Sequence, residues 1–331
     1  TIYRPLDELS ISPEGLSPRL IKNGYDSYSM LNGRVYALPL DPSVQIFLYR
    51  TDLFHDAKLC RAYYERFHEN LVVPTTYEQY LHAAEFFTRS CNPDSPTEYG
   101  TTMTCGSASV AASDFLPFYL SRIDRFGSTP ETLRLDSPEM QAAMRQYHAL
   151  EKFSCKQNWW GDSIQKFAEG KTAMTVIYSN YAAELINSGN SVVVGRVGAA
   201  ILPGCKPLLG GGIVGISRYS QKAEACKQFF HWYYSADVAS LLVRLGGTSP
   251  IVDAYEDFQN YSIFPWMNTS KKSFGLGQRG VINQTPERFS IPKYEFAVGT
   301  AVRNVVQDLM TPEDASRMAQ ALYDAADPVC R

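Results

Sequence analysis

The stretch from residue 167 to residue 181, FAEGKTAMTVIYSNY, constrains the fold more than any other part of the sequence. It predicts the end of a short helix, a helix stop at Gly170, a buried strand over residues 173–177 and a polar, aromatic turn. A glycine just after a helical turn can take a positive φ and end the helix, and a β-branched run suits a strand covered on both faces. Ligands of open α/β sheets bind beyond the carboxyl ends of the strands. The turn therefore predicts a ligand cleft, with the candidate side chains Tyr178, Asn180 and Tyr181.

Size and composition indicate a packed globular protein. The 331 residues suffice for two domains, because single cores stop growing at about 250–300 residues. The sequence is 45% hydrophobic and 20% charged, as is typical of packed domains. Its net charge is −3 and it contains no run of lysines or arginines, so it shows no nucleic-acid-binding footprint. No apolar run is long enough to span a bilayer.

The seven cysteines include no CxxC pair, and no histidine lies near enough in sequence to suggest a zinc site. We therefore expect buried small hydrophobes rather than reactive thiols, and neither a metal nor a cofactor.

Two expected strands near the N-terminus, residues 35–39 and 45–49, are separated by Pro39 and Pro42. A chain that crosses at such a proline-marked segment can form a hinge between two lobes. Further strands are expected at residues 191–197 and 199–202, and residues 260–290 are expected to be irregular.

Helix signals occur at several places. Residues 76–79 fit a capping box, Ser137-Pro138 places proline at a favoured first helical position, and the last helices are expected at residues 296–309 and 312–324. Residues 100–113 are rich in small side chains and precede an apolar helix. A ligand can approach the backbone or a helix N-terminus there, with Ser107 as the candidate contact; a close-packed turn is the alternative.

Catalytic signatures are missing from the sequence. It contains no HExxH and no GxSxG motif. The GxGxxG match at residues 275–280 follows no strand and opens no helix, so it lacks the context of a dinucleotide site. What remains is a set of polar and aromatic residues at strand ends and turns, which suits a recognition cleft without a nucleophile and base: Asp41, Ser43, Tyr178, Asn180, Tyr181 and Tyr294.

Several stretches together resemble a known family. They are LDEL at 6–9, NGRVYALP at 32–39, LYRTDLF at 48–54, PTTYE at 74–78, FAEGKTAM at 167–174, LPG at 202–204, the glycines from 210 to 215, residues 225–234, and Ser249-Pro250. In this order and spacing the sequence resembles the extracellular solute-binding proteins of ABC importers that include maltose-binding protein.

The resemblance implies an α/β, periplasmic-binding-protein-like fold with two lobes that close on a ligand by hinge motion. Residues 47–205 and 288–331 would form the C-terminal lobe, and residues 1–40 and 213–260 part of the N-terminal lobe. The hinges would lie near residues 40–46 and 208–212. Chains of the family usually begin with further residues, so one lobe is expected to be incomplete here.

The resemblance also implies site residues. The segment after Pro39 would supply a polar ligand contact from Asp41 or Ser43, and the turn after the Ala-Met strand an aromatic platform from Tyr178 or Tyr181, with Asn180 between them. The glycine pair would contribute Gly211. Sugar binders often carry an aromatic residue next, where this chain has glycine; the candidates for a second platform are Trp159, Trp160, Trp266 and Tyr294.

By this resemblance the chain is expected to be a monomeric, non-enzymatic protein that captures a carbohydrate or oligosaccharide and hands it to a membrane permease. Its expected location is extracellular or periplasmic, with a lipid anchor upstream of Thr1 as one option. Three alternatives stay open: a ligand-sensing module of a larger regulatory protein, a binder of a polyamine or metal chelate, and a glycosidase that uses Asp41 and Glu295.

Overall fold

The computed structural model describes residues 2–21, 29–31, 33–123, 133–187, 189, 191–278 and 290–325. Asn32 of the expected turn, residues 279–280 of the rejected glycine motif and the ends of the 288–331 segment lie outside these residues.

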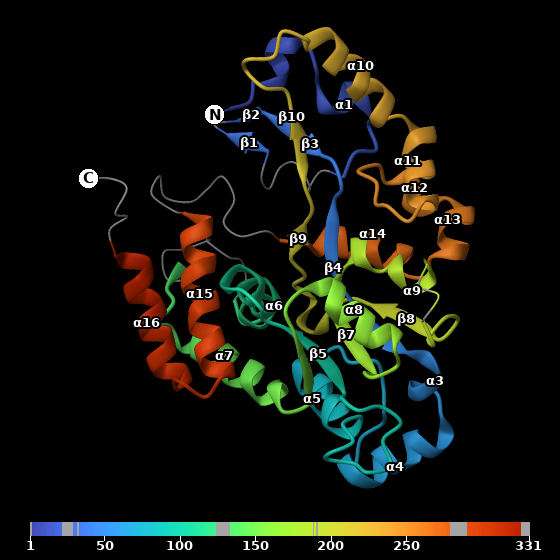
Figure 1. The fold of residues 1–331 in the computed structure, drawn as a ribbon, viewed down its shortest axis with the longest axis vertical. Helices are drawn as coiled ribbons and strands as arrows, with labels where there is room; N and C mark the ends of the chain where they lie inside the picture. The colour runs from blue at the N-terminus through green and yellow to red at the C-terminus, as the bar shows by residue number, and fades with distance from the viewer. Residues whose placement is uncertain are drawn as a thin grey trace.

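Strands and helices are mixed along the chain as far as β10, and the elements named after β10 are all helices (Figure 1). The strands are β1 Met30–Leu31, β2 Arg34–Val35, β3 Ala37–Pro39, β4 Ser43–Arg50, β5 Thr101–Thr104, β6 Ser154–Gln157, β7 Met174–Tyr178, β8 Val197–Ala200, β9 Leu209–Gly210 and β10 Ile213–Gly215. The helices up to β8 are α1 Pro13–Leu16, α3 Thr51–Phe54, α4 Ala57–Phe67, α5 Tyr77–Phe86, α6 Ala108–Leu120, α7 Pro138–Glu151, α8 Trp160–Ala168 and α9 Glu184–Asn187. Those after β10 are α10 Ala223–Tyr233, α11 Ala236–Arg244, α12 Asp253–Glu256, α13 Phe258–Ile263, α14 Met267–Leu276, α15 Ile291–Val306 and α16 Pro312–Asp324. The 3-10 turns are η1 Leu6–Leu9, η3 Ser179–Tyr181 and η4 Pro203–Cys205.

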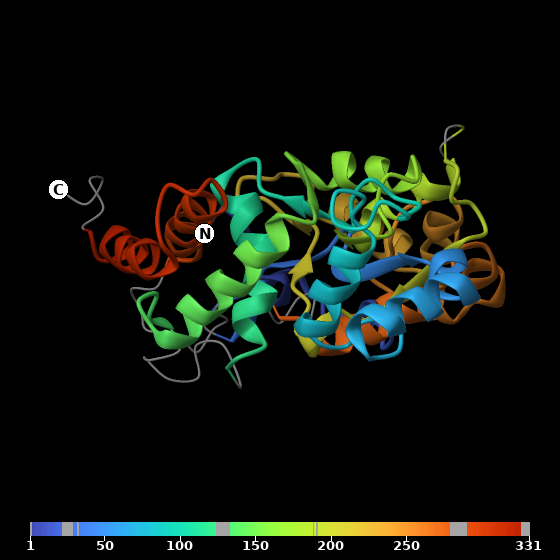
Figure 2. The ribbon, with the colours of Figure 1, turned by 90° about the horizontal axis from the view of Figure 1, so that it is seen from below.

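Strand β4 is the centre of the fold. It pairs antiparallel with β7 along one edge and with β8 and β9 along the other. Successive side chains of a strand point to opposite faces, and the two faces of β4 enter different cores. Phe47 packs with α5, α6, α7 and α15, whereas Ile46 and Leu48 pack with α8, α10, α11 and α14. The two views agree that α15 and α16 lie on the side of the molecule away from α13 (Figures 1 and 2).

The chain crosses between two small sheets near the amino end of β4. Strand β3 pairs with β10, and β4 pairs with β9, so residues 40–42 and 211–212 connect them side by side. Just after α14, Gln278 joins the segment before β9: its N–H donates to Pro207 O at 2.9 Å and its carbonyl oxygen accepts from the Leu209 N–H at 2.7 Å. The sequence did not predict this contact.

Several local predictions are confirmed. Gly170 has φ +73° and lies just after the end of α8, where the chain turns toward β7. Thr76 and Gln79 form the capping box of α5, and the side chains of Ser137 and Thr311 cap α7 and α16.

Other predictions are wrong. Residues 260–276 are mostly helical rather than irregular, because α13 and α14 occupy them. In the expected strand 191–197 only Val197 is extended in a ladder, and Val192 and Val194 are exposed. The cysteines are also less buried than expected: among the six that the structure describes, all free, Cys91 and Cys205 are exposed and the rest are half-buried.

Candidate functional site

The two crossings, at residues 40–42 and 211–212, form a compact, hydrogen-bonded crossing segment. The Leu40 N–H donates to Gly212 O at 2.9 Å, and the Gly212 N–H donates to Asp41 Oδ1 at 2.5 Å. Gly211 between them has φ +96°, and a Cβ there would lie 2.2 Å from Asp41 O. Only glycine fits that conformation and that space. Asp41 and Gly211, both expected at the ligand, therefore hold the two crossings together.

A hollow of about 180 Å³ lies beside the crossing segment. It is lined by side chains from α6, the start of α8, the end of β7, the β9 segment and α15: Ser109, Val110, Ser113, Leu116, Trp159, Trp160, Tyr178, Leu208, Leu209 and Glu295. Tyr178 also connects the hollow to the crossing segment, because a Cβ at Gly210 would lie 2.6 Å from the Tyr178 ring and 2.8 Å from Ser43 Oγ. Pockets for drug-sized ligands measure about 300–1,000 Å³, so this hollow can enclose one small ring.

An unbroken run of aromatic rings forms one wall of the hollow. Trp160 packs edge-on against Tyr178 with centroids 4.9 Å apart and against Trp159 at 4.8 Å, and Trp159 meets Tyr181 at 6.2 Å. Trp160 is buried, whereas Trp159 is 46% exposed and leaves part of its ring to solvent. Burial raises the pKa of Tyr181, and its hydrogen bond with Trp159 acts in the opposite direction. The wall presents apolar ring faces to the hollow, and Tyr181 adds a neutral hydroxyl beside it.

Gln45 fixes two walls of the hollow relative to each other. Its side chain is fully buried on β4. Its Nε2 donates to Ser113 O on α6 at 2.8 Å, and its Oε1 accepts from the Leu208 N–H at 2.9 Å. The role of Gln45 is not visible in the sequence, because a glutamine inside an apolar strand finds these two partners only when α6 and β9 pack against β4.

The expected site residues fall into two groups. Tyr178, Tyr181, Asn180 and Ser43 gather at the end of β7 and the start of β4, where Ser179 Oγ accepts from the Val44 N–H at 3.2 Å. Of these four, Tyr178 is the one that lines the hollow. Asn180 Oδ1 is shielded from solvent and has no hydrogen-bond partner among the described residues.

The other expected residues lie apart from the hollow's lining. Ser107 is exposed, and its Oγ caps α6 by accepting from the Val110 N–H at 3.4 Å. Tyr294 is buried among the helices with its ring 5.7 Å from that of Tyr323, and Trp266 is buried in the core around α14. The hollow instead takes Glu295, the residue after Tyr294, together with Ser109 and Ser113 of α6.

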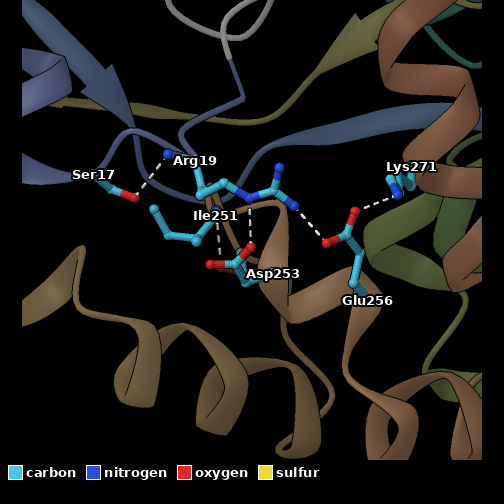
Figure 3. Close-up of polar contacts among 7 residues, drawn as sticks. Ser17, Arg19, Ile251, Asp253, Glu256 and Lys271 are labelled. Carbon is cyan, nitrogen blue, oxygen red and sulfur yellow. Dashed lines mark hydrogen bonds and ion pairs between the residues drawn. The ribbon is translucent and has the colours of Figure 1, made fainter.

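A larger hollow, about 250 Å³, lies where residues 20–21 meet α12 and α14. Its lining is apolar apart from Lys271, whose Nζ is 2.5 Å from Glu256. Arg19 completes the network with Asp253 at 2.6 Å and Glu256 at 2.5 Å, so two cations face two carboxylates (Figure 3). Since the charged groups at its rim are paired with one another, this hollow offers few polar groups to a hydrophilic ligand.

The sequence from residue 4 to residue 266 matches the family described as bacterial extracellular solute-binding protein. The chain belongs to this family. It is a family of binding proteins rather than enzymes, so the glycosidase alternative falls away. Within the described residues, no helix of this solute-binding protein is long and apolar enough to cross a membrane.

Solved structures share the periplasmic-binding-protein fold of this chain. An ABC transporter solute-binding protein from Agrobacterium radiobacter K84, in complex with ribitol, is 22% identical with a TM-score of 0.77, over 97% of this chain and 79% of that chain. Maltose-bound MalE3 of T. maritima is 19% identical, with a TM-score of 0.76, over 97% and 80% of the two chains. The maltotriose-bound MalE domain of Bdellovibrio bacteriovorus is 17% identical, with a TM-score of 0.69, over 98% and 79%.

Proposed function

We propose that this solute-binding protein captures a carbohydrate or polyol in the hollow beside the hinge and delivers it to the permease of an ABC importer. The observation that carries the proposal is the aromatic wall of Trp159, Trp160 and Tyr178 facing the serines and carboxylate of α6 and α15. Aromatic faces cover the apolar C–H face of a sugar ring, while hydroxyl and carboxylate oxygens bond its hydroxyl groups. The sugars and polyols bound by the solved structures are of the same chemical class.

Capture would use motion at the crossings. In this proposal residues 47–205 and 288–331 form one lobe, and residues 1–40 and 213–260 belong to the other. The hydrogen-bonded segment at residues 40–42 and 211–212 is the hinge. Because the hollow adjoins the hinge through Tyr178, a ligand there would favour one hinge angle over others.

A thermal-shift screen tests the proposal. The purified chain is heated with polyols, monosaccharides, oligosaccharides, polyamines and amino acids. A ligand at 100 times its Kd adds about 2.7 kcal/mol to the free energy of unfolding, which raises Tm visibly. Stabilisation by sugars or polyols supports the proposal. A cooperative melt that shifts only with polyamines or amino acids would contradict it.

Trp159→Ala is expected to weaken binding of an oligosaccharide hit by roughly tenfold, which equals about 1.4 kcal/mol. The reason is the position of Trp159 at the open end of the aromatic wall, where a sugar unit that extends beyond the hollow would stack. Isothermal titration calorimetry measures the change in Kd. The control is Phe258→Ala, because Phe258 is an aromatic residue that is 69% exposed on α13 and does not line the hollow. Equal affinities of the two variants would remove Trp159 from the site.

A further inference from the structure

Two consecutive tyrosines bind two consecutive carbonyl groups of the first crossing. Tyr234 Oη donates to Pro39 O at 2.8 Å, and Tyr233 Oη donates to Leu40 O. Both tyrosines lie at the carboxyl end of α10, which is almost two hundred residues further along the chain. These hydroxyls therefore tie α10 directly to the hinge segment.

The first crossing has few backbone N–H groups that could donate hydrogen bonds to carbonyl groups nearby. Pro39 and Pro42 have no N–H, and their rings fix φ. The Leu40 N–H already donates to Gly212 O. Pro39 is buried, as is Tyr234, and a buried carbonyl without a partner is costly. The tyrosine hydroxyls thus act where the backbone itself cannot.

Packing on α10 holds the two rings in place. Tyr233 and Tyr234 meet edge-on at 5.2 Å, Tyr234 packs on the buried Phe230 at 5.9 Å, and Tyr233 stacks on Phe229 at 5.6 Å. Burial raises the pKa of Tyr233 to about 12, with Asp41 acting in the same direction, and burial also raises the pKa of Tyr234. Both side chains stay protonated at physiological pH and keep their hydroxyl donors.

We propose that Tyr233 and Tyr234 are positioning residues that set the resting angle of the hinge and so tune ligand affinity without touching the ligand. The inference rests on the hinge motion in the proposed function. Asp41 holds the second crossing through Gly212, and the tyrosines hold the first crossing from α10. Because α10 belongs to the same proposed lobe as residues 1–40, a rotation at Leu40 must break the hydrogen bond from Tyr233 and strain the one from Tyr234.

The test uses Tyr233→Phe and Tyr234→Phe, which remove one hydroxyl each and keep the ring. Tyr255→Phe is the matched control, because the Tyr255 hydroxyl is also buried and also donates to a backbone carbonyl, that of Ser249 at 3.0 Å, away from the crossings. Arg61 of α4 and Glu224 of α10, whose side chains are both 82% exposed, are each replaced by an unnatural amino acid that carries a ketone. Spin labels are attached to these ketones, so that the native cysteines remain unmodified. Double electron–electron resonance then measures the distribution of distances between the spin labels on α4 and α10 in the absence of ligand.

The expected result is a broader or displaced distance distribution in both hinge variants, with the distribution of Tyr255→Phe equal to that of the parent. The affinity for a sugar hit should change at least threefold in the hinge variants and stay unchanged in the control. Distributions that coincide in all four proteins would overturn the proposal, even if Tm falls, because lost stability alone is what a structural hydroxyl predicts. If no sugar binds the parent, the proposed function fails, but the ligand-free distances still decide whether the tyrosines set the hinge.

Discussion

Asp114→Asn is expected to remove most of the dependence of stability on pH between the ordinary pKa of an aspartate and neutrality. Asp114 is buried on α6, where its Oδ2 accepts from the Tyr147 hydroxyl at 2.7 Å and from the Thr104 N–H at 3.2 Å. Burial raises the pKa of this carboxyl to about 7 from 3.8, although both hydrogen bonds act in the opposite direction. Tyr80, Tyr147 and Cys105 lie close enough to interact electrostatically with Asp114, and none of these three groups carries a positive charge.

The sign follows from which state binds the proton more tightly. The folded protein has the higher pKa, so the stability that the protonated Asp114 contributes is complete below pH 3.8 and is lost as pH rises to about 7. A difference of about three pKa units corresponds to about 4 kcal/mol at most. Asparagine keeps an acceptor oxygen and never ionises, so the variant should be the more stable protein at pH 8 and gain little at pH 4.

Urea unfolding at pH 4, 5.5, 7 and 8 measures this effect, with Asp94→Asn as a control. Asp94 is exposed in a loop, and its replacement should leave the pH profile of the parent unchanged. If the Asp114→Asn and parent proteins keep a constant difference in free energy of unfolding from pH 4 to pH 8, then Asp114 is not the group that titrates.

Local chemistry made much of the fold predictable. The stop at Gly170, the capping box of α5 and the proline at the start of α7 each depend on a few neighbouring residues. Such signals survive in any tertiary context. The strand of residues 173–177 was also predictable from local sequence, because its β-branched run favours a buried strand.

Helix α14 was not predictable in this way. Its buried face carries Ser270 and Ser273 between Met267 and Phe274, and two serines at core positions conceal the helical period. The opposite error occurred at residues 191–197, where valines favour a strand but no neighbouring strand is available over most of the segment. In both places tertiary packing decided the structure.

The candidate site was predictable only where one segment supplies it. The turn after β7 brings together Tyr178, Asn180 and Tyr181, as expected from the sequence. The opposite wall comes from α6 and α15, two helices that lie far apart in the sequence and meet only in the folded protein. One residue on a helix changes its direction by about 100°, so Tyr294 faces the core and its neighbour Glu295 faces the hollow.

Gly299→Ala is expected to be among the most damaging single substitutions in the chain. Helices α15 and α6 cross in close contact at this glycine, where an added Cβ would lie 1.7 Å from Ala108 O and 2.4 Å from Ala108 C. The clash is with backbone, so it can be relieved only by moving one helix. Overpacking of this kind typically costs about 1–3 kcal/mol, and more where the backbone must shift. We expect a loss of at least about 3 kcal/mol.

The same movement should reach the hollow. Glu295 lies one turn before Gly299 on α15, and Ser109 follows Ala108 on α6, so the contact at Gly299 sets the width of the hollow between the two helices. Urea unfolding measures the stability and calorimetry the affinity for the sugar identified in the screen. Gly275→Ala is the control: Gly275 is also helical, but a Cβ there meets nothing within 4 Å. Alanine has the higher helix propensity, so this control should gain up to about 1 kcal/mol. If Gly299→Ala matched its control in stability and affinity, the close contact of α6 and α15 would have no part in shaping the site.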